Sequence, residues 1–172
     1  MARQFALSDN EVLTLVRSGS ETGGELLEVT AEWTPGSHRP PPPHFHPNQD
    51  EHFEVAAGEL NVKLDGERRV LRAGDTLDVP RGVVHAMWNA GSEPARATWQ
   101  VRPALRTEEF WEAMSNLRAA GHRSKNGSVD LPGAALLFRK FRDEIRLTMS
   151  PAVTGPLFML LAAWARVRGY ES

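Results

Sequence analysis

Between residues 11 and 102 the chain consists of short runs of Val, Leu, Thr and Trp that stop at Gly, Pro, Asn or Asp. Within these runs apolar and polar residues alternate, which is typical of strands that bury one face. Asp65-Gly66 joins two runs and is a strong signal for a tight hairpin. Short strands with turns at this spacing favour a barrel or a sandwich. We expect eight strands, at about 11–17, 25–34, 50–57, 59–64, 67–72, 76–79, 83–90 and 95–102.

The hydrophobic period changes near residue 105, where helical patterns replace strand patterns. Helix-start residues and apolar stripes at helical spacing follow from there to the end of the chain. The sequence therefore predicts a β domain at 1–105 and a helical C-terminal extension at 106–172. We expect three helices, the first from Thr107 to Gly121, the second near 131–148 and the third from Ser150-Pro151 or Thr154 to Arg168.

The third predicted helix contains Pro156 to Ala165, a stretch that is apolar on every side. Ten residues are too few to span a bilayer, which needs about 20. The stretch could pack on the outside of the β domain, cross to a partner subunit or lie at a membrane surface. Because an all-round apolar helix needs two covering surfaces, we favour burial in a homodimer. Peripheral membrane contact, through Arg166 and Arg168 beside Trp164, is the disfavoured alternative.

Composition excludes several classes of protein. The chain has no cysteine, which rules out disulfide scaffolds, thiol catalysis and iron–sulfur ligation. Lys and Arg number 20 against 22 Asp and Glu, so the formal net charge is −2 and no nucleic-acid partner is expected. The first ten residues carry no apolar run of the kind found in signal peptides, and a cytoplasmic location is the default expectation.

Five of the six histidines lie between residues 38 and 85. In an extended strand His44 and His46 point to the same face, so their imidazoles can converge. Glu51 begins the next apolar run, and His85 lies in a separate strand-like run. Inward residues from separate strands can meet inside a barrel. Three imidazoles and one carboxylate suit a divalent transition metal with open positions for water and substrate, although spacing alone makes this only feasible.

Two motifs with fixed spacing cover residues 44–89. The first reads His44-x-His46-x4-Glu51-x6-Gly58. The second reads Gly74-x5-Pro80-x-Gly82-x2-His85-x3-Asn89. Together these motifs resemble those of the cupin superfamily, whose first motif usually has a glycine six residues before the first histidine. Here that position holds His38, and the nearest glycine is Gly36.

The resemblance implies a mainly β fold: an antiparallel cupin β-barrel, also called a double-stranded β-helix or jelly roll. The barrel is expected to cover roughly 20–105, with the C-terminal helices outside it. The resemblance also implies one divalent metal per chain, held by His44, His46, Glu51 and His85. Iron, manganese, nickel, zinc and cobalt remain open, because such mixed sites bind several of these ions. No other cofactor is expected.

Other residues near the motifs carry weaker expectations. Glu51 itself and His38 are the candidates for moving protons, and no separate acid–base pair is evident. His52 is expected to face the opposite side of its strand from Glu51. Trp99 is expected to serve core or interface packing. By alternation, four residues share faces with the metal ligands and are expected to line a pocket or fill the barrel: Phe53, Val55, Val83 and Met87.

The sequence leaves three functions open. A metal-dependent enzyme that acts on a small organic molecule is favoured, with an oxygenase (a dioxygenase-like oxidoreductase) slightly ahead. Lewis-acid chemistry by an isomerase, cyclase or lyase is the second possibility. A non-catalytic barrel that binds a small ligand is the third. Only about 20 residues precede the barrel, too few for the helix-turn-helix of a DNA-binding regulator.

Overall fold

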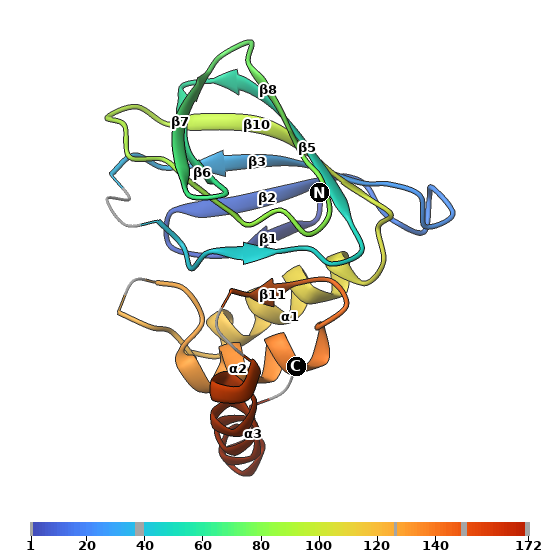
Figure 1. The fold of residues 1–172 in the computed structure, drawn as a ribbon, viewed down its shortest axis with the longest axis vertical. Helices are drawn as coiled ribbons and strands as arrows, with labels where there is room; N and C mark the ends of the chain where they lie inside the picture. The colour runs from blue at the N-terminus through green and yellow to red at the C-terminus, as the bar shows by residue number, and fades with distance from the viewer. Residues whose placement is uncertain (1, 37–39, 126, 149–150, 171–172) are drawn as a thin grey trace.

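The computed structural model describes residues 2–36, 40–125, 127–148 and 151–170, with the side chains of the last helix described from residue 155. Its β part consists of two antiparallel sheets (Figure 1). The first sheet has the order β1-β2-β3-β10-β5-β8. Its strands are β1 (Gln4–Ala6), β2 (Glu11–Arg17), β3 (Leu27–Trp33), β10 (Ala95–Arg102), β5 (Asp50–Ala57) and β8 (Thr76–Val79).

The second sheet has the order β11-β4-β9-β6-β7. Its strands are β11 (Arg146–Leu147), β4 (His44–Phe45), β9 (His85–Trp88), β6 (Glu59–Leu64) and β7 (Glu67–Arg72). The chain crosses repeatedly between the two sheets, so strands that are distant in sequence become neighbours. The fold is therefore mainly β and antiparallel, as the motifs predicted.

All eight expected strands are present, with ends within a few residues of those predicted. The hairpin between β6 and β7 turns at Asp65 and Gly66, which both have positive φ, of 47° and 92°. Three further strands, β1, β4 and β11, were not predicted. They have only two or three residues each, too few to show an alternating pattern.

Alternate residues of the strands form the hydrophobic core between the sheets. Leu27, Val29 and Ala31 of β3 are fully buried, and Leu60 and Val62 of β6 face them from the second sheet. Burying each large apolar side chain stabilises the folded state by about 1.5–3 kcal/mol. This core holds in place the strands that carry the histidines.

Gly58, the last residue of the first motif, has a steric role in the turn between β5 and β6. Its φ is +71°, and a Cβ atom at this position would lie 2.3 Å from the carbonyl oxygen of Pro94. Only glycine fits such a close approach at this backbone conformation. Gly58 therefore has a structural role in the β domain and no direct role at the candidate site.

Three helices follow the barrel: α1 (Thr107–Ala119), α2 (Leu131–Lys140) and α3 (Pro151–Val167). The expected helix over 131–148 is wrong in its second half, because α2 ends at Lys140. Phe141 closes the helix as a fully buried residue, and the chain then turns back so that β11 pairs with β4. Tertiary burial of Phe141 and Ile145 thus overrides the helical pattern. Ser150, one of the two proposed starts of the third helix, lies outside the described residues.

The helical extension packs against one end of the β part (Figure 1). Phe110, Trp111 and Leu117 of α1 belong to the same hydrophobic cluster as the strands. The domain boundary at residue 105 remains a prediction. The β domain and the helical extension share one hydrophobic core, and β11 of the extension belongs to the second sheet. The extension therefore places β11 beside β4 in this sheet.

α3 lies farthest from the sheets and packs on α2 (Figure 1). Ala162 and Ala165 are buried, whereas Leu160 is 69% exposed and Val167 is 86% exposed. Among the described residues, no helix is both long and apolar enough to cross a membrane.

Candidate metal centre

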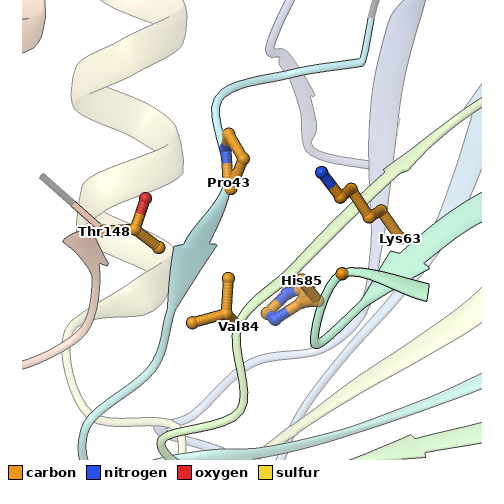
Figure 2. A pocket seen from close by; sticks show the side chains of 6 residues that line it. Pro43, Lys63, Val84, His85 and Thr148 are labelled. Carbon is orange, nitrogen blue, oxygen red and sulfur yellow. The ribbon is translucent and has the colours of Figure 1, made fainter.

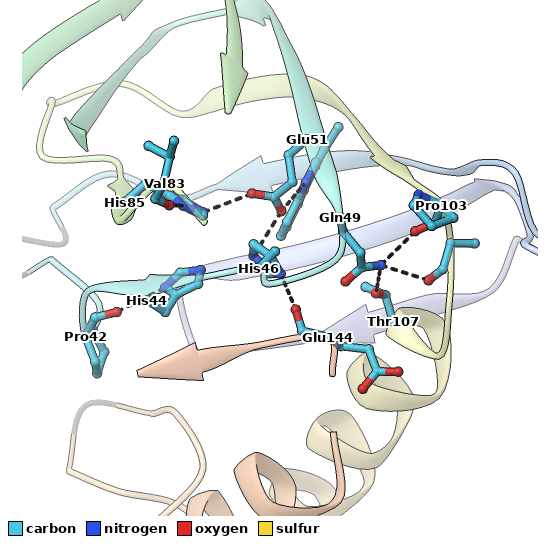
Figure 3. A network of polar contacts seen from close by, with 12 residues as sticks. Pro42, His44, His46, Gln49, Glu51, Val83, His85, Pro103, Thr107 and Glu144 are labelled. Atoms are coloured by element: carbon cyan, nitrogen blue, oxygen red, sulfur yellow. Dashed lines mark hydrogen bonds and ion pairs between the residues drawn. The ribbon is translucent and has the colours of Figure 1, made fainter. Parts of the chain in front are cut away.

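Three histidines meet where β4 and β9 run side by side. His44 lies on β4 and is the register partner of His85, the first residue of β9, while His46 directly follows β4. One ring nitrogen from each of the three side chains lies within 4.8 Å of the other two. His46 and His85 are buried, and His44 is half-buried. The two motifs therefore converge on a single point, as the sequence indicated (Figure 3).

Glu51 of β5 brings a carboxylate to this cluster from the other sheet. Its Oε2 atom lies 2.9 Å from Nε2 of His85, and its Oε1 atom lies 3.3 Å from Nε2 of His46. Yet Glu51 Oε2 and His46 Nε2 are buried without a hydrogen-bond partner. Such orphaned groups cost about 1–3 kcal/mol each unless a ligand satisfies them. The donor set and its unpartnered atoms fit a divalent transition metal.

All three imidazoles are oriented by their Nδ1 atoms. Each Nδ1 faces a backbone carbonyl oxygen: Pro42 at 3.1 Å for His44, Glu144 at 2.7 Å for His46, and Val83 at 3.1 Å for His85 (Figure 3). A carbonyl oxygen only accepts, so Nδ1 carries the proton in each ring. This leaves the Nε2 lone pairs free to bind a cation, an arrangement that fixes tautomer and ring orientation in metal sites.

The electrostatics of the cluster favour an added cation. Burial, together with the neighbouring imidazoles of His85 and His46, lowers the pKa of His44 to about 3. Burial opposes ionisation of Glu51, but His46 and His85 outweigh it and lower the pKa of this carboxyl to about 2. Burial also opposes protonation of His85, but its contact with Glu51 outweighs this and raises the pKa of that ring. The buried carboxylate thus draws positive charge to itself, a role that a metal ion can fill.

Trp99 of β10 is a site residue that the sequence reading treated as core or interface packing. Its indole Nε1 donates a hydrogen bond of 3.0 Å to Oε1 of Glu51. The ring stacks on Phe53, and Trp111 of α1 packs against it. The sequence indicates this role of Trp99 only through its inward-facing position on the predicted strand 95–102.

Gln49 is a second residue that the motifs did not single out. It lies within the first motif, and its fully buried side chain contacts the start of α1. Its amide nitrogen donates to the carbonyl oxygens of Pro103 and Ala104 and to the hydroxyl of Thr107. Gln49 therefore ties the loop that carries His46 to the beginning of the helical extension.

Two residues of the second motif have structural roles. The backbone N–H of Gly82 donates to the carbonyl oxygen of His46 at 2.9 Å, which links the two motifs. The buried side chain of Asn89 donates to the carbonyl oxygens of Trp33 and Glu93 and accepts from the N–H of Gly91. These contacts shape the strands around the histidines.

The remaining sequence-based candidates lie in different places. Phe53 and Val55 are buried in the core, and Val83 and Met87 are partly buried against it. His52 faces the outer side of β5, where its Nδ1 atom lies 2.7 Å from Asp78 Oδ1. The second proton-transfer candidate, His38, lies outside the described residues.

A cavity of about 260 Å³ lies beside the cluster (Figure 2). It is lined by Pro43, Lys63, Gly66, Val84, His85 and Thr148. A larger hollow of about 490 Å³ lies over β5, β8 and β10 and includes Glu51, His52 and Arg102. The smaller cavity therefore borders His85 of the candidate metal centre, whereas the larger hollow lies on the outer face of the sheet beside His52, and the four expected pocket residues line neither of them.

The fold and the site together define a small two-sheet protein with a three-histidine, one-carboxylate centre inside it. Residues 29–101 match the family model described as Cupin domain. A solved RmlC-like cupin from Shewanella frigidimarina has the same fold, with a TM-score of 0.51 and 21% identity over 63% of this chain and 89% of that one. Residues 29–101 of this chain are therefore similar to the cupin domain, as the two motifs indicated.

Curated relatives match the chain over part of their length. The tetracenomycin polyketide synthase protein TcmJ of Streptomyces glaucescens is 37% identical over 60 residues, which are 35% of this chain and 40% of that protein. Oxalate oxidase 1 of Hordeum vulgare is 38% identical over 85 residues, 45% of this chain and 41% of the relative. The chain thus spans about 40% of the length of these relatives.

Proposed function

We propose that this chain is a metal-dependent enzyme that acts on a small organic substrate. The observation that carries this proposal is the cluster of His44, His46, His85 and Glu51, with its two buried unpartnered atoms. A barrel that only stores or carries a ligand has no need of a buried carboxylate among three imidazoles. These four residues would hold one divalent ion, and their donor chemistry suits iron, manganese, nickel, zinc and cobalt alike.

The bound metal would supply Lewis acidity or, with iron or manganese, one-electron chemistry at the end of the barrel. The chain contributes orientation: carbonyl oxygens fix the three imidazoles, and Trp99 fixes Glu51. Burial of His46, Glu51 and His85 keeps bulk water away from the ligands. With three imidazoles and one carboxylate bound, an octahedral ion would retain about two positions for substrate and water or dioxygen.

Within this class we favour an oxidoreductase of the oxygenase type. Oxalate oxidases are the relatives with the longer matched segment, 85 residues against 60 for the polyketide synthase proteins. Their name describes the oxidation of a small organic acid, and a substrate of similar size would suit a cavity of about 260 Å³. The substrate itself remains a subject for screening.

A cyclase is the second candidate. It is supported by the relatives named as polyketide synthase proteins, TcmJ and CurC, which are 37% and 40% identical over 60 residues. Here the metal would act as a Lewis acid without dioxygen.

The test is elemental analysis of protein purified without chelator or nickel affinity resin, followed by oxygen-uptake screens with small organic acids. About one iron or manganese per chain with substrate-dependent oxygen uptake would support the oxidoreductase. About one zinc, nickel or cobalt without oxygen uptake would favour the cyclase. If no metal is present and none binds on reconstitution, the enzyme proposal fails and a ligand-binding barrel remains.

A further inference from the structure

We propose that Trp99 is a positioning residue that restricts Glu51 to binding the metal through one oxygen, Oε2. This inference rests on the metal site proposed above and adds a residue that neither cupin motif contains. It assigns to a tryptophan on β10 control over how many positions on the metal stay open.

The two oxygens of Glu51 have different surroundings. Oε1 accepts the indole N–H of Trp99 at 3.0 Å. Oε2 is buried and accepts no such hydrogen bond: its neighbour at 2.9 Å is Nε2 of His85, which presents a lone pair because the proton of that ring is on Nδ1. A carboxylate oxygen engaged by a donor is a poorer metal ligand than its free neighbour, because part of its charge is already used. The free oxygen, Oε2, is therefore the one left to the cation.

The indole of Trp99 is held so that its N–H cannot turn away. Trp99 is the cross-strand partner of Phe53, and the two rings stack with centroids 5.1 Å apart at 29°. On another side Trp111 of α1 packs against the indole with a centroid distance of 4.9 Å at 58°. Packing on both sides locks the rotamer of Trp99 and hence the direction of its donor.

This arrangement has a consequence for the reaction. If Glu51 bound through both oxygens, it would occupy one more position on the metal and close it to substrate. With Oε1 engaged by Trp99, the carboxylate contributes a single ligand atom. The helical extension takes part through Trp111, which supports the indole from α1.

The test compares the wild-type protein with Trp99→Phe, both stripped of metal and reloaded with cobalt(II). Cobalt affinity is measured by competition with a chromophoric chelator, and the visible absorption spectrum reports the ligand arrangement. We expect Trp99→Phe to bind cobalt 10- to 100-fold more weakly, the usual effect of losing an outer hydrogen bond at a metal ligand. We also expect an altered spectrum, because Glu51 becomes free to bind through both oxygens.

Trp33→Phe is the matched control, since it makes the same change at a buried tryptophan of β3 that lies opposite Ala95, whereas Glu51 pairs with Val101 at the other end of β10. It should keep a cobalt affinity within about threefold of wild type, well below the loss expected for the donor, and an unchanged spectrum. If Trp99→Phe does not fold, 3-benzothienylalanine at position 99 retains the shape of the ring and replaces its N–H by sulfur. It should then show the weaker affinity and the altered spectrum.

Wild-type affinity together with a wild-type spectrum in the variant that lacks the N–H would overturn the role of Trp99 while leaving the metal site intact. Failure of the wild-type protein itself to bind cobalt would instead refute the proposed metal site. The two failures are therefore distinguishable.

Discussion

The Nδ1 atom of His46 lies 2.7 Å from the backbone carbonyl oxygen of Glu144, which follows it by 98 residues in the sequence. This contact joins a candidate metal ligand to the C-terminal extension. Next to it β11 pairs with β4, so that Leu147 is the register partner of His44. The extension thus takes part in building the candidate metal centre and does not merely cover it.

The pairing of β11 with β4 predicts that metal affinity depends on the extension. Thr148→Pro removes the backbone N–H that Thr148 donates to the carbonyl oxygen of Pro43 at the end of this short ladder, and should loosen the segment that holds His46. We expect metal affinity to fall by about 10-fold, as for other outer-shell contacts. Thr148→Ala is the control, since it loses the side-chain hydroxyl but keeps the N–H, and should bind metal as wild type. Equal affinities measured by isothermal titration calorimetry would contradict this link.

The histidine cluster predicts which substitutions abolish metal binding. His85→Ala or His44→Ala should remove stoichiometric metal, because each leaves too few donors at the site. The fold should persist, since the core between the sheets is untouched. His52→Ala, on the outer side of β5, should retain about one metal per chain by mass spectrometry. Retention of the metal in both site variants would refute the ligand assignment.

Adding a single methyl group at Gly58 should greatly reduce the stability of the folded protein. Gly58→Ala combines a positive φ of 71° with a contact of 2.3 Å to the Pro94 carbonyl oxygen. We expect a loss of about 2–4 kcal/mol in the free energy of unfolding, measured in urea. Gly23→Ala has a similar φ of 64° but meets nothing within 4 Å, so it should cost only about 1 kcal/mol. Equal losses in the two variants would show that steric contact is not the cause.

Because of the raised pKa of Glu11, we expect the free energy of unfolding to fall as the pH rises. Burial raises the pKa of its carboxyl from 4.5 to about 7, so the folded state holds this proton more tightly than the unfolded state. The free energy of unfolding should therefore decline between pH 4.5 and about 7, and then level off for this group. Since the residue is half-buried, we expect at most about 3 kcal/mol, at about 1.36 kcal/mol for each pKa unit.

Two variants isolate that contribution. Glu11→Gln cannot ionise and should flatten the decline, as followed by urea unfolding at pH 5 and pH 8. Glu32→Gln, at an exposed position on β3, should leave it unchanged. A decline that persists in Glu11→Gln would assign the pH dependence to another group.

The homodimer expected from the sequence stays a prediction, and the exposed apolar side chains of α3 provide its test. Leu160→Glu with Val167→Glu places two charges on that face, where both side chains are now largely exposed. If α3 forms the interface, the variant should become monomeric in light scattering. Val16→Glu, at an exposed position on β2, should leave the mass unchanged. A wild-type monomer, or a dimer that survives both charges, would refute the interface.

The sequence by itself determined the eight longer strands and the four residues that meet at the candidate metal centre. Both depend on local patterns: alternation of apolar residues along a strand, and fixed spacing within two motifs. His44, His46, Glu51 and His85 come together because each motif places its ligands on inward positions of the sheets. Such positions can be predicted from the amino-acid sequence alone.

Only the tertiary structure decided what surrounds those ligands. The contact of His46 with Glu144 uses a backbone carbonyl, which every residue has and which no side-chain pattern can reveal. β4 and β11 are too short to show the alternating hydrophobic pattern of a strand. α2 ends earlier than expected because Phe141 is buried by residues that are distant in sequence. Trp99 reaches Glu51 through the register of β10 with β5, which depends on strand pairing across 48 residues of sequence. Long-range packing, rather than local propensity, therefore sets the outer shell of the site.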